Sequence, residues 1–439
     1  MATIFGKQPN EYTVNVVWKT DKAKTLYDVY RMEEGESERT VVLDNTRLCY
    51  EQYGVELTES RICVWGSYRS FEKAFYKFME LLWSNRDLTE SDSLVGAISL
   101  PTQPITRKEE LLSLLEYLMT DDRLLYGQHL SGSIQVNKMI DEYTVAVGDA
   151  PSIMDFDMIC LRKAHRGEWS RALCELVEYT AKGGVLTTMH HWLNPVHPES
   201  DTYRGSADGI DNWNEILTRG TPLNVEWHKE LDRGAEFLTA LKEAGVTFMY
   251  RPLHEANGGW FWFGAKEDIG AEELRRMWRY VYHYYVDECG LTNMLFSYGP
   301  NNSEMKEYSP LSARLYYPGD EYCDVVGCDW YSGGNDYYEI ESDVYEGNTY
   351  DRLAEYGKPF GLMEWGLDGN GNRLKLNCDD LVVMLKRMAS EGKRMAFAEI
   401  YGGGFGAPSV IGRGEALMEY EAILTLGEMP EYIRKALEK

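Results

Sequence analysis

A chain of 439 residues, 44% of them hydrophobic, is long enough for one large α/β domain with an extension. The formal net charge of −26 repels polyphosphates and anionic lipid, so it argues against nucleic acid and membrane partners and leaves a neutral substrate open. The 31 Tyr, 12 Trp and 13 Phe include candidates for flat surfaces on which sugar rings stack.

The cysteines and the N-terminus bear on the cellular compartment. The eight cysteines are scattered and form no CxxC pair, which favours reduced thiols. The opening MATIFGKQPNEY lacks the basic and apolar segments of a signal peptide, and no window approaches 18 uninterrupted apolar residues. We therefore expect a cytoplasmic protein, with secretion as the alternative if a leader has been trimmed.

The first ninety or so residues differ in pattern from the rest. Three strands and one amphipathic helix are expected there, at 12–18, 39–43, 61–65 and 71–83. The polar segment 84–93 is the best candidate for a linker. We expect a small α/β accessory module of unknown role over residues 1–95 and a catalytic domain over residues 96–439.

A regular alternation of strands and helices begins near residue 105. Eight apolar runs have the nearly continuous hydrophobicity of strands buried on both faces: 124–127, 153–161, 184–189, 246–253, 293–298, 324–331, 359–365 and 394–401. Amphipathic helices are expected between several of them, at 230–243, 272–286 and 380–390. Eight β/α units predict a (β/α)8 TIM barrel. The alternative, an open doubly wound sheet, is weakened because no GxGxxG or P-loop pattern follows the early strands.

A TIM barrel carries its active site at the carboxyl ends of its strands. The fourth run ends in RPLHEANGGWFWFG, which puts Glu255 at a strand end, and the seventh ends in MEWG, which does the same for Glu364. Strands four and seven face each other across the mouth of such a barrel. Glycoside hydrolysis needs two carboxyl groups flanking one bond, and a separation of about 5 Å indicates the retaining mechanism.

Other strand ends supply polar side chains. The sixth run ends in GCDWY, where Asp329 and Tyr331 share one face, and a phenol there could hold the carboxylate of the nucleophile. The first run ends in Gln128 and His129.

Metal catalysis is not expected. His190 and His191 are neighbours on a strand and point to opposite faces, so they cannot easily bind one ion. Gly258 stands where a zincin motif would need its second histidine. No GxSxG elbow offers a serine nucleophile, and no local signature offers a cysteine one.

Five segments in this order resemble glycoside hydrolase family 26, best known for β-mannanases. They are GQH at 127–129, HWLNP at 191–195, RPLHEANGGWFW at 251–262, YYPGDEYCDVVGCDWY at 316–331 and MEWG at 363–366. The similarity spans roughly residues 105–425 and implies a TIM barrel, retaining double displacement and no cofactor. It implies Glu255 as acid/base and Glu364 as nucleophile.

The resemblance and the strand-end positions together give a set of expected substrate-binding residues. They are Gln128, His129, His191, Arg251, His254, Asn257, Trp260, Trp262, Asp329, Tyr331 and Trp365. Three positions depart from the family pattern: His190 and Phe263 stand where Trp is common, and the eighth run lacks its usual Trp. These departures affect substrate-binding positions and leave both glutamates in place.

The sequence therefore predicts a retaining endo-β-1,4-mannanase acting on mannan or manno-oligosaccharides. A β-1,3-xylanase, a mixed-linkage β-glucanase and an exo-acting mannobiohydrolase are alternatives that use the same site. A non-catalytic carbohydrate-binding barrel is the alternative from another class, and the presence of both glutamates argues against it.

Overall fold

The computed structural model describes most of the chain from Gln103 onward. The described ranges are 103–130, 134–163, 166–198, 213–265, 270–301, 313–332, 349–367, 378–401 and 417–438, with five strands among the first hundred residues. The expected helix at 71–83 and linker at 84–93 lie outside the described residues. The chain divides into two compact units, one of Met1–Thr102 with Ala164–Ala181 and the other of Gln103–Lys163 with Lys182–Lys439.

The first unit contains short antiparallel sheets. β1, β2 and β5 form one sheet, and β3 pairs with β4 in another. Their bounds are β1 (Thr3–Gln8), β2 (Glu11–Trp18), β3 (Val29–Arg31), β4 (Val42–Asp44) and β5 (Ser60–Ile62). The three expected strands are confirmed as β2, β4 and β5, with shifted ends, and β1 and β3 were not predicted. The predicted boundary near residue 95 stays a prediction.

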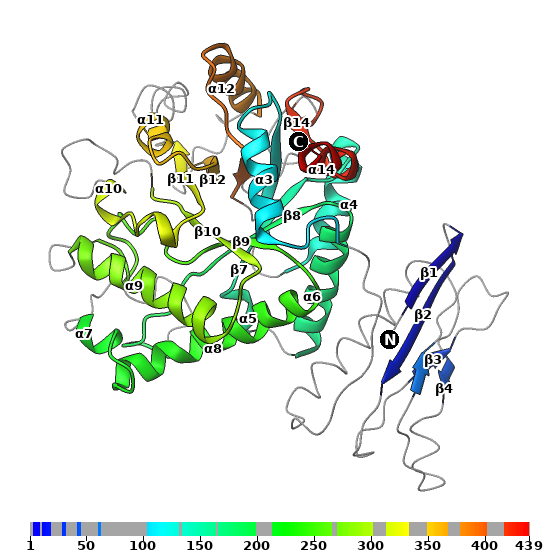
Figure 1. The fold of residues 1–439 in the computed structure, drawn as a ribbon, viewed down its shortest axis with the longest axis horizontal. Helices are drawn as coiled ribbons and strands as arrows, with labels where there is room; N and C mark the ends of the chain where they lie inside the picture. The colour runs from blue at the N-terminus through cyan, green and yellow to red at the C-terminus, as the bar shows by residue number, and fades with distance from the viewer. Residues whose placement is uncertain are drawn as a thin grey trace, which may run out of the picture. The chain divides into compact units, whose positions relative to one another are not determined.

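The second unit is a closed barrel of eight parallel strands (Figure 1), which confirms the predicted fold. Each strand pairs with the next along the chain, and β13 returns to pair with β6, with Glu399 beside Gly127. The strands are β6 (Leu124–Leu130), β7 (Ile153–Asp157), β8 (Val185–Met189), β9 (Phe248–Arg251), β10 (Met294–Tyr298), β11 (Val325–Ser332), β12 (Phe360–Leu367) and β13 (Phe397–Ile400). All eight expected runs are strands.

Helices connect successive strands. They are α4 (Val136–Val147), α5 (Cys160–Lys163), α6 (Arg166–Ala181), α7 (Trp213–Ile216), α8 (Pro222–Glu243), α9 (Ala271–His283), α10 (Ala313–Tyr316), α11 (Thr349–Ala354) and α12 (Cys378–Ser390). The three expected helices correspond to α8, α9 and α12. A short π-helix, Tyr284–Glu288, extends α9 and was not predicted.

A hydrophobic cluster of described residues fills the amino-terminal end of the barrel. It takes one residue from each of the eight strands and adds the apolar faces of α3 (Lys108–Leu118) and α14 (Met429–Leu437), which lie side by side in Figure 1. In α3 the buried Leu111, Leu114, Leu115 and Leu118 follow the i, i+3, i+4, i+7 spacing of one helical face. The two helices thus close the amino-terminal end of the barrel, which leaves the carboxyl end for the site.

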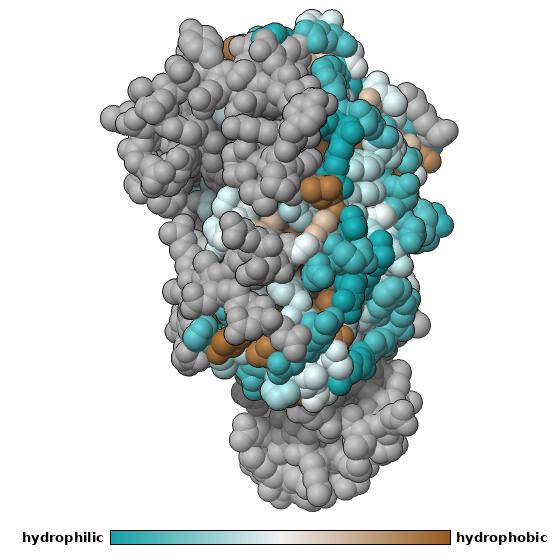
Figure 2. Space-filling view, turned by 90° about the vertical axis from the view of Figure 1, so that its left-hand side faces the viewer, coloured by the Kyte–Doolittle hydropathy of each residue, from teal (hydrophilic) through white to brown (hydrophobic). Residues whose placement is uncertain are grey.

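One face of the molecule is shown in Figure 2. On the face shown in Figure 2, hydrophilic residues predominate and hydrophobic ones are scattered among them. Apolar side chains scattered in this way are normal on a protein surface. Among the described residues, no helix has the length and apolar character needed to cross a membrane.

Candidate active site

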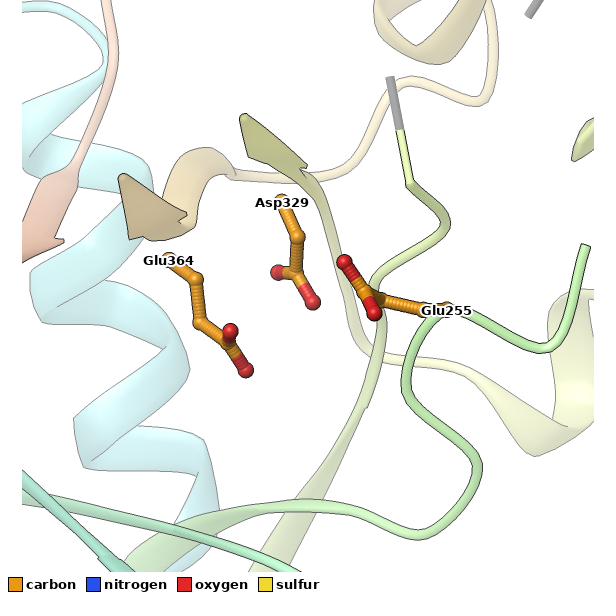
Figure 3. Close-up of side chains that lie close together, drawn as sticks. All are labelled: Glu255, Asp329 and Glu364. Carbon is orange, nitrogen blue, oxygen red and sulfur yellow. The ribbon is translucent and has the colours of Figure 1, made fainter. Parts of the chain in front are cut away.

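Three acidic side chains meet at the carboxyl end of the barrel (Figure 3). Glu255 follows β9, Asp329 lies on β11 and Glu364 on β12, and one oxygen from each lies within 4.8 Å of the others. Asp329 is fully buried, whereas Glu255 and Glu364 keep 8% and 4% of their surface exposed. Glu255 and Glu364 are therefore the two acids of the cluster that a substrate can reach.

Arg251, the last residue of β9, organises the other two acids. Its guanidinium donates to Oδ1 of Asp329 and to Oε1 of Glu364, and a third carboxylate, Asp155, lies 3.9 Å away. Burial alone would lower the pKa of Arg251, but the charges of Asp329 and Glu364 raise it. The arginine is thus a permanent cation that holds Glu364 in one orientation. Complete burial raises the pKa of Asp329, and the charge of Glu364 adds to the effect.

Glu255 occupies an unusual backbone position. Its φ of 49° is in the left-handed region, and among the described residues it is the one non-glycine there. Such a conformation costs about 1–2 kcal/mol and persists when surrounding contacts enforce it. Here the Glu255 amide donates to the Gly299 carbonyl at 2.9 Å, and the Gly258 amide donates to the Glu255 carbonyl at 2.8 Å. The strained turn directs the carboxyl group into the mouth.

The carboxyl group of Glu255 has two donors and a perturbed pKa. Asn301 Nδ2 donates to Oε1 at 2.5 Å, and Trp260 Nε1 donates to Oε2 at 2.7 Å. Burial, together with the negative charge of Glu364, raises the pKa of Glu255 to about 7, although both donors oppose the rise. A carboxyl group with such a pKa can give and take a proton near neutrality.

His191 and His254 form a second polar group beside the acids. Asp157, at the end of β7, accepts from His191 Nδ1 at 2.6 Å, and His191 Nε2 lies 3.0 Å from His254 Nε2. Although burial alone would raise it, the pKa of Asp157 is lowered by its contacts with His191, so Asp157 is an anion that orients the ring. His190 points the other way, stacks on Trp192 and faces Glu230 of α8. The prediction that the two histidines face opposite sides is confirmed.

His129 lies one level deeper in the barrel. Its Nε2 is 2.9 Å from Oδ2 of Asp155, and its ring packs against Tyr401. Burial alone would lower the pKa of His129, but the charge of Asp155 raises it to about 9. His129 is therefore a buried cation that pairs with Asp155 beneath Glu255 and Glu364. Asn257 is also a supporting residue, since its amide bonds both the carbonyl and the amide of Asn301.

Of the expected substrate-binding residues, Asp329, His129 and Asn257 are buried and hold other residues of the site in place. Three more do not face the mouth. Gln128 points outward and accepts a hydrogen bond from Tyr143 of α4. Trp262 is fully buried, donates to the Trp192 carbonyl and stacks on Trp213. Trp365 is fully buried and packs beside Tyr126.

The structure thus corrects these three predictions. Gln128 and Trp365 follow the strand alternation away from the neighbouring His129 and Glu364, and Trp262 belongs to the core. Trp260, with 39% of its surface exposed, does offer an aromatic face at the mouth. The side chain of Tyr331 lies outside the described residues.

Four residues of the site were missed from the sequence: Asp155, Asp157, Asn301 and Glu399. Asp157 ends β7 and Asn301 follows β10, so a strand-end position was the available signal for these two. Asp155 and Glu399 are acidic residues inside the apolar runs of β7 and β13. Whether such a side chain faces the barrel interior depends on the alternation of side chains along its strand and on how the barrel closes.

The three acids are also close enough together to ligate one cation. Arg251 already contacts two of them, Asp329 and Glu364, and supplies the positive charge that an ion would bring. That no metal takes part in the reaction stays a prediction.

A closed (β/α)8 barrel with two reachable acids at the carboxyl end, within about 5 Å of each other, defines the class of retaining glycosidases. Residues 102–371 match the profile of glycosyl hydrolase family 26, and the chain belongs to this family.

Similar proteins agree with this membership. A mannan endo-1,4-β-mannosidase from Bacillus subtilis is 32% identical over 201 residues, which cover 44% of this chain and 51% of that protein. Another, from Bacillus subtilis strain 168, is 29% identical over 259 residues, which cover 56% of this chain and 67% of that protein. The chain thus spans about half to two thirds of the length of these two relatives.

Solved structures share the fold. The structure of a Bacillus subtilis mannanase superposes with a TM-score of 0.57 at 23% identity and covers 75% of this chain and 95% of its own. A β-mannanase from a symbiotic protist of the termite Reticulitermes speratus, complexed with gluco-manno-oligosaccharide, gives a TM-score of 0.56 at 20% identity, covering 75% of this chain and 96% of its own.

Proposed function

We propose that this chain is a retaining endo-β-1,4-mannanase that hydrolyses mannan or manno-oligosaccharides. The observation that carries the proposal is the pair of reachable acids, Glu255 and Glu364, with oxygens within 4.8 Å of each other. A retaining enzyme needs its two carboxyl groups about 5–5.5 Å apart, whereas an inverting one needs about 6.5–9.5 Å to admit a water molecule. The names of the relatives support mannan as the substrate.

In the first step Glu255, protonated, donates its proton to the glycosidic oxygen while Glu364 attacks the anomeric carbon. The bond to the leaving sugar breaks, and a covalent glycosyl-enzyme forms on Glu364. The elevated pKa of Glu255, about 7, supports this role because the acid keeps its proton near neutrality. Arg251 supports the role of Glu364 by donating a hydrogen bond that holds the carboxylate in one orientation.

In the second step Glu255, now a carboxylate, takes a proton from water, and the water oxygen displaces Glu364 from the anomeric carbon. Loss of the negative charge on Glu364 in the intermediate lowers the pKa of Glu255, which suits its change from acid to base. Two inversions at the same carbon give net retention. Trp260, exposed beside Glu255, is the candidate to stack on a bound sugar.

The test is hydrolysis of mannan, xylan and mixed-linkage glucan by the wild type and by Glu364→Ala, with products separated by length. We expect the wild type to release mixed short manno-oligosaccharides and Glu364→Ala to lose kcat by several orders of magnitude while oligosaccharide binding by calorimetry survives. Glu391→Ala, at an exposed position after α12, is the matched control and should retain wild-type rates. Proton NMR of the first products should show the β anomer, as retention requires.

Other outcomes distinguish the alternatives. Release of disaccharide alone indicates exo action by the same chemistry, and cleavage of xylan or glucan changes the substrate but not the mechanism. Binding of oligosaccharide without cleavage by the wild type indicates a binding barrel. Near-normal rates for Glu364→Ala would show that the nucleophile has been wrongly assigned.

A further inference from the structure

Two more acids lie inside the barrel, one level below the catalytic mouth. Glu399 on β13 is 1% exposed, and its carboxyl oxygens lie 3.1 and 3.2 Å from the hydroxyl of Thr187 on β8. Asp155 on β7 is 2% exposed and bonds His129 through Oδ2. Its other oxygen, Oδ1, is buried and has no hydrogen-bond partner among the described residues. An orphaned buried carboxylate oxygen is costly and calls for a donor.

The barrel brings the two acids toward each other. β13 and β7 are both neighbours of β6, and at this level β6 carries Gly127, which pairs with Ile153 on one side and Glu399 on the other. β13 and β7 also contact each other across β6, which carries no side chain at Gly127. Asp155 itself pairs with His129 of β6 and with Thr187 of β8. The Thr187 hydroxyl contacts both carboxyl oxygens of Glu399, so the two acids are neighbours of the same threonine.

We propose that Glu399 retains its proton and donates it to Oδ1 of Asp155, so that the two carboxyl groups share one proton beneath the catalytic acids. A second buried negative charge beside Asp155 would be strongly unfavourable in this enclosed space. The shared proton removes that charge and satisfies the orphaned oxygen in one contact.

The electrostatic surroundings of Glu399 agree with this assignment. Burial, with the charge of Asp155, raises the pKa of Glu399 well above its usual range, while His129, Arg251 and Thr187 oppose the rise. These are the charged and polar groups that face Glu399 from β6, β7, β8 and β9. The negative charge of Glu364 on β12 also helps to raise the pKa of His129.

Arg251 connects the pair of Asp155 and Glu399 to the two catalytic-level acids, Asp329 and Glu364. Asp155 Oδ2 lies 3.9 Å from Nη2 of Arg251, which holds Asp329 and Glu364. If Glu399 were ionised, two anions below would compete with the nucleophile for one guanidinium. Glu399 is therefore a positioning residue that keeps Arg251 directed toward Glu364, and this role, unlike the shared proton itself, rests on the proposed function.

The shared proton is tested without substrate, by measuring the unfolding equilibrium constant between pH 5.5 and 7. A group with a raised folded pKa binds its proton in the folded state and releases it on unfolding, so stability falls as pH rises through this window. Glu399→Gln should reduce the slope of log K against pH by close to one proton. Glu110→Gln, which removes a carboxylate of lowered pKa on α3, is the control and should leave the slope unchanged in this window.

Two further results bear on the shared proton. Asp155→Asn leaves Glu399 buried but removes the neighbouring negative charge that also raises its pKa, so it should reduce the slope by less than Glu399→Gln does. It serves as the second variant if Glu399→Gln fails to fold. A slope for either variant equal to that of the wild type would overturn the proposal.

The positioning role is tested by kinetics on the substrate that the wild type cleaves. Glu399→Gln keeps an N–H donor and should keep kcat within about threefold, whereas Glu399→Leu leaves Oδ1 of Asp155 without a donor and should lower kcat about tenfold or more. A fall in kcat with little change in KM separates positioning from loss of sugar binding. A kcat for Glu399→Leu equal to that of the wild type would refute the positioning role. It would not affect the conclusion on the shared proton, which is tested separately by the pH dependence of unfolding.

Discussion

Removing the amide that donates a hydrogen bond to Glu255, the proposed acid/base, should shift the pH dependence of catalysis to higher pH. Asn301 Nδ2 donates to Glu255 Oε1 at 2.5 Å, and this hydrogen bond favours the ionised form of Glu255. In Asn301→Ala the carboxylate loses one of its two side-chain donors, and the pKa of Glu255 rises above its value of about 7. The protonated, acid-competent form then persists to higher pH.

The size of the effect follows from the strength of one charge-assisted hydrogen bond. A hydrogen bond to a charged group contributes about 1.5–3 kcal/mol, and about 1.4 kcal/mol corresponds to one pH unit. Allowing for water that enters the space left by the amide, the lower value applies, and the basic limb should move upward by about one pH unit.

The assay is kcat/KM against pH on a soluble manno-oligosaccharide, since this parameter reports the ionisations of the free enzyme. Trp260→Phe, which removes the donor to Oε2, should shift the basic limb in the same direction and also raise KM through loss of aromatic surface. A basic limb in Asn301→Ala that stays in place or moves to lower pH would refute the assignment of Glu255 as the group that titrates there.

Three other perturbations follow from the geometry. Asp157→Asn weakens the hold on His191 and should lower kcat about tenfold. The depressed pKa of Asp157 means that its stabilising contribution is present above the unfolded pKa, near 4, and is lost as pH falls below it; melting curves of Asp157→Asn should therefore depend less on pH in that acidic range. Gly127→Ala should not fold, as circular dichroism will show, because a Cβ there would lie 1.6 Å from the Ile153 carbonyl oxygen. Leu114→Ala in α3 should cost about 2–5 kcal/mol in denaturant unfolding and leave kcat at 25 °C unchanged, since the cavity forms at the closed end of the barrel.

The strand positions were predictable because strands buried on both faces are marked by continuous hydrophobicity. All eight runs from 124–127 to 394–401 correspond to barrel strands, and their carboxyl ends hold Glu255 and Glu364. The accessory strands were predicted less completely, since β1 and β3 were missed. The domain boundary near residue 95 and the cellular compartment stay predictions.

The orientation of individual side chains was harder to predict. Strand alternation correctly separated His190 from His191. The same alternation turns Gln128 and Trp365 outward, because their neighbours His129 and Glu364 face inward.

The sequence by itself determined the barrel, the location of the active end and the two glutamates, because each depends on local hydrophobicity and on residue type at a strand terminus. Tertiary structure alone decided which acids stand together. The register between β11 and β12 shifts at Cys328 and Asp329, and this irregularity aligns Asp329 with Glu364. Closure of β13 onto β6 brings Glu399 toward Asp155, although 244 positions separate them in the chain. Such pairings depend on long-range contacts between strands, which no local pattern of residues records.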